Sequence, residues 1–127
     1  FVNLGLVSGD GGAWFLPKIV GYQRAAEMTF SGRLVKADEA LELGLVLEVV
    51  KPDQLIESAT NMAREFASKP PITVRYTKRL LKESQRSELR DFLSHCSFFQ
   101  AVCHQTDDHK EAVNAFVEKR KAAFAGR

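Results

Sequence analysis

The opening stretch, residues 1–14, limits the possible folds of this 127-residue chain more than any other part of the sequence. Residues 1–7 form an apolar run of strand length with little alternation, which is typical of a strand buried on both faces. A buried strand needs neighbouring strands, and few other segments of this chain have strand character. We therefore expect the chain to be part of a larger protein.

The apolar run ends in a turn that contains Gly9, Gly11 and Gly12 together with one carboxylate, Asp10. A helix is predicted behind the turn, at residues 13–20. Backbone N–H groups and the positive end of a helix dipole would then face an anionic or polarised ligand group. Alternatively, the turn needs glycine only for its backbone dihedrals, and Asp10 caps the helix. A glycine-rich turn by itself favours this second interpretation.

Most of the remaining chain has the apolar spacing of short helices. Asp53 and Thr106 are predicted N-caps, and Gly32 is a predicted left-handed C-cap. The predicted helices after the first cover residues 23–31, 36–43, 53–69, 71–83, 88–104 and 106–124, with Lys119, Arg120 and Lys121 toward the end of the last one.

Strand character is limited to short segments. Besides residues 1–7, residues 45–50 are rich in strand-forming side chains, and residues 33–35 form a brief extended piece. The pattern favours a helical array attached to the last part of a sheet. The Pro70–Pro71 pair is the one plausible subdomain boundary, because proline disfavours helical geometry in the residue before it.

Composition and charge exclude several classes of partner. The chain has 18 basic and 16 acidic residues, a net charge of +2, so neither nucleic acid nor an anionic membrane is expected as the main partner. No apolar run approaches the roughly 20 residues of a membrane-spanning helix. Cys96 and Cys103 lie on one predicted helix, too far apart to bond, and are expected to be reduced core residues of an intracellular protein.

Other polar groups are assigned no chemistry. The spacing of histidine and cysteine supports no metal site, and His95, His104 and His109 have no expected partner at nucleophile or ligand spacing. The basic cluster at residues 78–82 is expected to be a solvated helix face, with phosphate contact as the alternative.

Three segments occur in the order and spacing of a known family: GLVSGDGGAW at residues 5–14, ADEALELGLV at residues 37–46 and FVEKR at residues 116–120. The chain resembles the C-terminal half of the enoyl-CoA hydratase/isomerase (crotonase) superfamily. The resemblance implies a mainly α fragment of an α/β protein. Residues 1–69 would be the end of the crotonase ββα spiral, and residues 70–127 would be a helical region that builds homotrimers, often paired into hexamers.

The chemistry that the resemblance implies is stabilisation of a thioester enolate. Two backbone N–H groups form an oxyanion hole in this family, and carboxylates move protons or activate water. The oxyanion-hole loops and the first catalytic glutamate lie upstream of residue 1 in the family, so the isolated chain is not expected to hold a complete site or to be active. The missing N-terminal half would supply them.

The implied substrate is an acyl-CoA, a coenzyme A thioester, and no cofactor is permanently bound. The favoured reaction is hydration of a 2-enoyl-CoA in fatty acid or related acid degradation. The alternatives are double-bond isomerisation and non-catalytic acyl-CoA binding or oligomerisation. The family places such a protein in the cytoplasm, or in the mitochondrial matrix of a eukaryote.

The resemblance singles out residues of the glycine turn. Phe1 occupies the position where hydratases carry their second catalytic glutamate. Some isomerase-like relatives place an aspartate at the position of Gly9, one residue before Asp10. Asp10 is therefore the candidate catalytic carboxylate, with capping of the helix as the alternative. Gly9, Gly11 and Trp14 are candidate pocket residues, and core packing is equally compatible with Trp14.

The resemblance also places part of a coenzyme A site near the C-terminus. Lys119 matches the lysine that faces phosphate in the family, and Phe116 matches an apolar residue beside it, both contributed by a neighbouring subunit. From the residues alone, Lys119 would be an ordinary solvated lysine at a helix end, and Phe116 would pack in a core.

Overall fold

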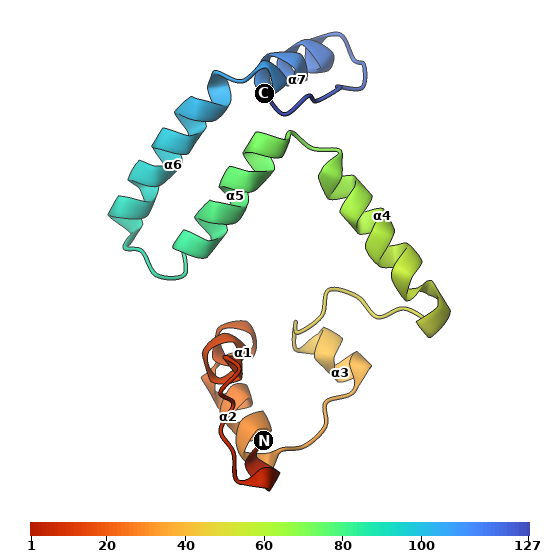
Figure 1. Cartoon of the computed structure of the whole chain (residues 1–127), viewed down its shortest axis with the longest axis vertical. Coiled ribbons are helices and arrows are strands. Elements are labelled where there is room, and N and C mark those ends of the chain that lie inside the picture. The colour runs from red at the N-terminus through yellow and green to blue at the C-terminus, as the bar shows by residue number, and fades with distance from the viewer. The chain divides into compact units, whose positions relative to one another are not determined.

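The computed structural model describes all 127 residues, which form two compact units, Phe1–Leu55 and Ile56–Arg127. The elements follow one another as in Figure 1, and none of them is a strand. They are η1 (Val2–Leu4), α1 (Gly12–Val20), α2 (Tyr22–Ser31), α3 (Ala37–Glu42), η2 (Pro52–Gln54), α4 (Leu55–Ala67), α5 (Pro71–Glu83), α6 (Leu89–His104) and α7 (Asp107–Val117).

The first unit is built around the contact between α1 and α2. Gly21 joins the two helices at φ 81°, in the region that side chains with a Cβ rarely adopt. Its N–H donates to Pro17 O, so the connection closes within a single residue. Val20 and Ala25 are the buried apolar side chains on either side of Gly21. Gly32 ends α2 at φ 61°, which confirms the predicted left-handed cap.

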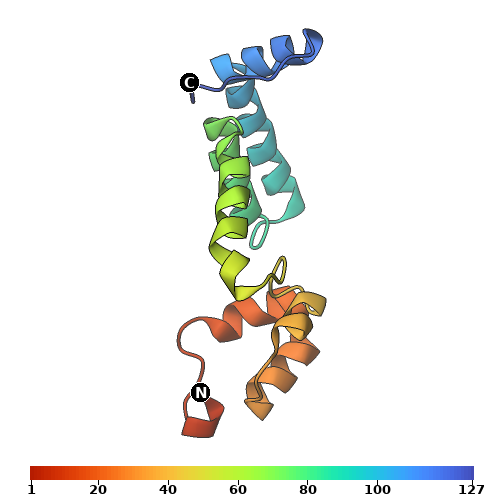
Figure 2. The same cartoon turned by 90° about the vertical axis from the view of Figure 1, so that its right-hand side faces the viewer.

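The second unit is built around the hairpin of α5 and α6, which lie side by side in Figures 1 and 2. Phe99 on α6 is 7% exposed, and its ring stacks on that of Tyr76 on α5 with centroids 4.6 Å apart. The bounds of α5 agree with the prediction, because Pro71 is pre-organised for the first helical position. None of the helices in the chain is long and apolar enough to cross a membrane.

The last helix begins as predicted and ends earlier. Thr106 Oγ1 accepts the N–H of His109 at 3.1 Å, which confirms the N-cap. The predicted extension of the helix to residue 124 is wrong: α7 ends at Val117, and residues 118–127 fold back along it (Figure 1). Hydrogen bonds from this returning segment to Asp108 and Glu111 stabilise the bend in place of further helical turns.

The strands predicted at residues 1–7 and 45–50 are wrong for this chain. A strand exists only where its N–H and C=O groups pair with a neighbouring strand. Near the N-terminus these groups pair locally instead: the N–H of Leu4 donates to Phe1 O and that of Gly5 to Val2 O. Residues 45–50 contain bends and no regular element. The mainly helical class is confirmed.

The N-cap predicted at Asp53 is also wrong. Pro52 begins the 3-10 turn η2, Lys51 holds the capping position before it, and α4 starts only at Leu55. Proline has no N–H and a fixed φ suited to the first helical position. The cap therefore falls on the residue before Pro52, and Asp53 lies within the first turn.

Candidate functional site

The glycine turn closes tightly in front of α1. Gly11 is the N-cap residue at φ 96°, and Asp10 Oδ1 accepts the N–H of Gly12 at 3.0 Å. A Cβ at Gly12 would lie 3.2 Å from both Asp10 Oδ1 and Ser8 Cβ. The turn therefore requires small residues, and the carboxylate satisfies one of the free N–H groups at the start of the helix.

Only one oxygen of the Asp10 carboxylate is hydrogen-bonded within the chain. Its Oδ1 accepts the bond from Gly12, while Oδ2 makes no hydrogen bond within the chain, and the residue is exposed. The capping contact that we expected as an alternative is therefore present. It leaves one carboxylate oxygen able to bind water or another group.

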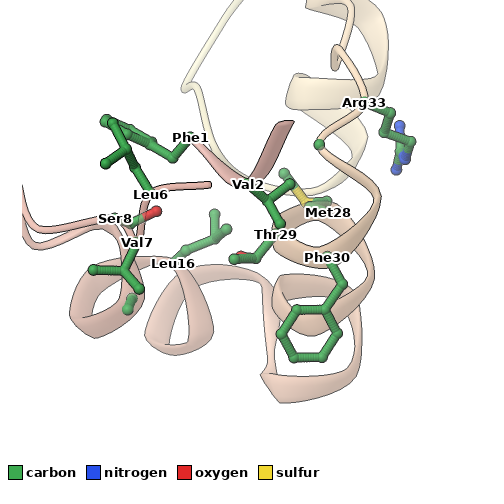
Figure 3. A pocket seen from close by; sticks show the side chains of 12 residues that line it. Phe1, Val2, Leu6, Val7, Ser8, Leu16, Met28, Thr29, Phe30 and Arg33 are labelled. Carbon is green, nitrogen blue, oxygen red and sulfur yellow. The ribbon is translucent and has the colours of Figure 1, made fainter. Parts of the chain in front are cut away.

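A pocket of about 470 Å³ lies beside this turn, between the N-terminal residues and helices α1 and α2 (Figure 3). Its lining is mostly apolar and consists of Phe1, Val2, Leu6, Val7, Ser8, Ala13, Leu16, Met28, Thr29, Phe30, Gly32 and Arg33. Ser8, the residue just before the glycine turn, is part of the pocket lining. The candidate residues Gly9, Asp10, Gly11 and Trp14 are not part of this lining.

The one cationic side chain at this pocket, Arg33, forms ion pairs with carboxylates. Arg33 points away from the apolar side chains in Figure 3 and binds two carboxylates, Glu27 at 2.8 Å and Glu39 at 2.7 Å. Hydrogen bonds from Arg33 lower the pKa of both glutamates. The Arg33 charge is thus compensated, and the pocket presents chiefly an apolar surface.

Trp14 lies outside the core of this chain. Its side chain belongs to a residue 62% exposed, and the ammonium nitrogen of Lys18 lies 3.5 Å from the ring centroid. This is a cation–π contact one helical turn apart. The indole therefore lies close to the glycine turn in sequence and is open to solvent.

The C-terminal candidate residues lie where the chain turns back. Lys119 is the one non-glycine residue with positive φ, at 55°. Arg120 follows it and binds Glu111 through both Nη atoms, at 2.6 and 2.8 Å, and Glu118 through Nε at 2.5 Å. The Arg120 hydrogen bonds, followed by the N–H of Ala123, lower the pKa of Glu111 to about 2.

Phe116 does not pack in a core, contrary to what the residue pattern favours. The residue is 85% exposed, because no other element of this chain covers that side of α7. Phe116 and Lys119 both face solvent near the end of the helix. An exposed aromatic ring close to an unpaired ammonium is a combination that can contact a nucleotide.

One polar cluster, around Glu83, was not predicted from the sequence. Glu83 is 8% exposed and accepts hydrogen bonds from Arg79 Nε and His95 Nδ1, both at 2.9 Å. The bond from Arg79, followed by that from His95, lowers the pKa of Glu83. His95 thus has a hydrogen-bond partner in Glu83, a contact that was not predicted from the sequence. The i,i+4 spacing of Arg79 and Glu83 was visible in the sequence, but the partner from α6 depends on how the hairpin packs.

Arg79 also contacts the hairpin of α5 and α6, and its side chain stays exposed like those of Lys78 and Lys82, as predicted for a solvated basic face. Its guanidinium carbon lies 5.1 Å from the ring centroid of Phe99.

Cys96 and Cys103 are free thiols and half-buried. No group of three or more His, Cys, Asp or Glu side chains is arranged to hold a metal ion.

Comparison with known proteins gives the family. The sequence matches the enoyl-CoA hydratase/isomerase family over residues 1–127. The chain belongs to this family. The resemblance to the crotonase superfamily is therefore confirmed.

Relatives within the enoyl-CoA hydratase/isomerase family include hydratases and an isomerase. The short-chain-enoyl-CoA hydratase of Clostridium acetobutylicum is 36% identical over 120 residues, covering 94% of this chain and 46% of the relative. The crotonyl-CoA hydratase of Syntrophomonas wolfei is 34% identical, covering 99% and 48%. The 1,2-epoxyphenylacetyl-CoA isomerase of Escherichia coli is 30% identical, covering 100% and 48%.

A solved structure of the family agrees with the helical arrangement. The enoyl-CoA hydratase of Bacillus anthracis matches with a TM-score of 0.95 at 34% identity, covering 99% of this chain and 49% of the other. The chain thus spans about half the length of these family members.

Proposed function

We propose that the protein is an enoyl-CoA hydratase that acts on a short 2-enoyl thioester of coenzyme A. The observation that carries the proposal is the similarity to two hydratases, which extends over 94% and 99% of the chain at 36% and 34% identity. One of these relatives is named for crotonyl-CoA and the other for short-chain enoyl-CoA. Crotonyl-CoA is therefore the substrate to test first.

Hydration joins a water oxygen to C3 of the enoyl group and adds a proton at C2. Such a reaction needs a group that takes a proton from water and gives one to carbon. Phe1 has no such group, whereas Asp10 offers a carboxylate oxygen without a partner in the chain. We assign Asp10 as the acid–base residue, with Gly9, Gly11 and Trp14 bordering the thioester. The Gly12 N–H fixes the carboxylate and keeps it available for this role.

The coenzyme A end of the substrate is assigned to the C-terminal segment. Lys119 would contact phosphate and Phe116 would lie beside it, as the family resemblance implies. Both are exposed, and the ammonium of Lys119 makes no ion pair within the chain. An unpaired lysine is a suitable point-charge partner for phosphate. The thioester is a substrate, and the proposal includes no permanently bound cofactor.

Isomerisation is the second candidate, and two observations favour it. Phe1 replaces the glutamate that the resemblance leads one to expect in a hydratase, and Asp10 is the one carboxylate in the glycine turn. The similarity to the E. coli isomerase extends over all 127 residues. Shifting a double bond requires one group that removes a proton and returns it at another carbon, which a single carboxylate can do.

The arrangement of the whole protein is part of the proposal. Residues 1–69 would complete a ββα spiral, and residues 70–127 would form the helical region that joins subunits into trimers or hexamers. The oxyanion hole would come from chain outside these residues. We place the protein in the cytoplasm, or in the mitochondrial matrix of a eukaryote.

An assay of the full-length protein with two substrates tests the proposal. Crotonyl-CoA is followed by the loss of conjugated-thioester absorbance, and a 3-enoyl-CoA is followed by the appearance of that absorbance. Hydration of crotonyl-CoA supports the hydratase. Conversion of the 3-enoyl-CoA without hydration supports the isomerase. Binding of coenzyme A esters without turnover of either substrate would indicate a non-catalytic acyl-CoA-binding protein.

A further inference from the structure

The returning segment, residues 118–127, is hydrogen-bonded to α7, and we call it the C-terminal strap. The carboxylate of Asp108, a residue 2% exposed, accepts the N–H groups of Ala125 at 2.7 Å and Gly126 at 2.9 Å. Glu111 Oε1 accepts the N–H of Ala123 at 2.9 Å. These bonds fix the path of the backbone well beyond the end of the helix.

Lys119 occupies the bend at which the strap leaves α7. Its φ of 55° lies in the left-handed region, where glycine or asparagine is usual because a Cβ crowds the backbone. A residue in such a conformation persists only where its surroundings hold it. The chain thus carries a long cationic side chain at a position where glycine would be less strained.

Arg120 supplies the restraint on one side of Lys119. Its two Nη atoms bind the two oxygens of Glu111, nine residues earlier, and its Nε binds Glu118. A bidentate pair of this kind fixes direction as well as distance. The guanidinium is therefore occupied by carboxylates, while the ammonium of Lys119 makes no ion pair with any of them.

We propose that Arg120 is a positioning residue for coenzyme A binding: paired with Glu111, it holds the left-handed bend that presents the Lys119 ammonium to a phosphate group. The inference rests on the proposed function, because it takes the phosphate partner of Lys119 from there. It adds that two adjacent basic residues have separate tasks. Lys119 binds the ligand, and Arg120 acts through the backbone of Lys119.

Binding of coenzyme A to the full-length protein, measured by calorimetry, tests this division. Lys119→Gly is expected to weaken binding about tenfold, the effect of losing one charge-assisted bond. The same change is expected to raise the midpoint of thermal unfolding, because glycine relieves the strain at the bend. Arg120→Lys keeps the charge but loses the bidentate pair, and is expected to weaken binding severalfold while kcat at saturating substrate stays unchanged.

The decisive readout is the double variant. If Arg120 acts through Lys119, then Arg120→Lys weakens binding in the wild-type background and has no further effect in Lys119→Gly. Equal losses in the two backgrounds, or no loss in either, would overturn the inference. A wild-type protein that binds no coenzyme A at all would instead overturn the proposed function. Lys121→Ala is the matched control and is expected to leave binding and stability nearly unchanged.

Discussion

At the scale of single residues, the Asp10 carboxylate accepts the Gly12 N–H and is the acid–base group in the proposed function. Asp10→Asn keeps an oxygen that accepts the Gly12 N–H but removes the ability to transfer a proton. We expect kcat for crotonyl-CoA to fall by about 100-fold or more, with little change in thermal stability. Asp10→Ala removes both functions and is expected to lose in addition about 1 kcal/mol of stability.

The matched control for Asp10 is Asp53→Asn, an exposed aspartate near the start of α4. Steady-state kinetics and thermal unfolding of the three variants separate the two tasks. An Asp10→Asn enzyme with wild-type kcat would remove Asp10 from the catalytic machinery and leave it as a cap.

Lys119 gives the second prediction at this scale. Lys119→Ala is expected to weaken binding of coenzyme A esters mainly at low ionic strength, where attraction to phosphate is least screened. The difference from wild type should shrink as salt is added beyond about 0.15 M, where the screening length is about 8 Å. Calorimetric titrations at three salt concentrations provide the measurement. A difference independent of salt would indicate a contact other than a charge interaction.

At the scale of the helices, the hairpin of α5 and α6 depends on the ring pair of Tyr76 and Phe99. Phe99 is 7% exposed, and its neighbour Phe98 is 64% exposed. Phe99→Ala is expected to lower the free energy of unfolding by about 3 kcal/mol, because it removes a buried aromatic ring. Phe98→Ala is the matched control, with an expected cost below about 1 kcal/mol. Denaturant unfolding of both variants measures the loss in the free energy of unfolding. Equal losses would contradict the prediction.

The hydrogen bonds between the C-terminal strap and α7 predict that the stability of the fold depends on pH. Arg120 and the Ala123 N–H lower the pKa of Glu111 from 4.5 to about 2. A carboxyl with a lowered native pKa stabilises the fold above its unfolded pKa, and that contribution is lost as the pH falls toward the native value. Stability should therefore decrease between about pH 4.5 and pH 2, and this decrease should be smaller in Glu111→Gln. Thermal unfolding between about pH 2 and pH 6 measures it.

Local signals explain which elements could be predicted from the sequence. Thr106, Pro71 and Gly32 mark helix ends through contacts within a few residues, and all three predictions are confirmed. The strands at residues 1–7 and 45–50 depend on neighbouring strands, which no local pattern supplies. For the same reason the bend at Lys119 could not be foreseen: a pair between residues nine apart fixes it.

In the candidate site, too, contacts between residues close in sequence could be predicted, and contacts between different helices could not. The capping contact of Asp10 follows from the sequence, because it involves the N–H two residues later. The partnership of His95 with Glu83 does not follow, because it depends on how α5 and α6 face each other. The proposed roles of Asp10 and Lys119 follow from the family resemblance, because no local pattern of residues specifies them.

At the scale of the whole molecule, the chain spans about half the length of the hydratases it matches. Many large apolar side chains of this chain are exposed, among them Leu89 and Leu93 on α6. Exposed apolar surface of this extent favours contact with further protein. We expect the full-length protein to sediment as a trimer or hexamer. A monomer at micromolar concentration would contradict the proposed assembly.

The position of Trp14 has a practical consequence for all of these measurements. It is the one tryptophan of this sequence, it lies on the first turn of α1, and its indole is open to solvent beside Lys18. Indole emission changes when water around the ring is replaced. We therefore expect the fluorescence of Trp14 to change when an acyl group reaches the glycine turn, as the proposed function implies.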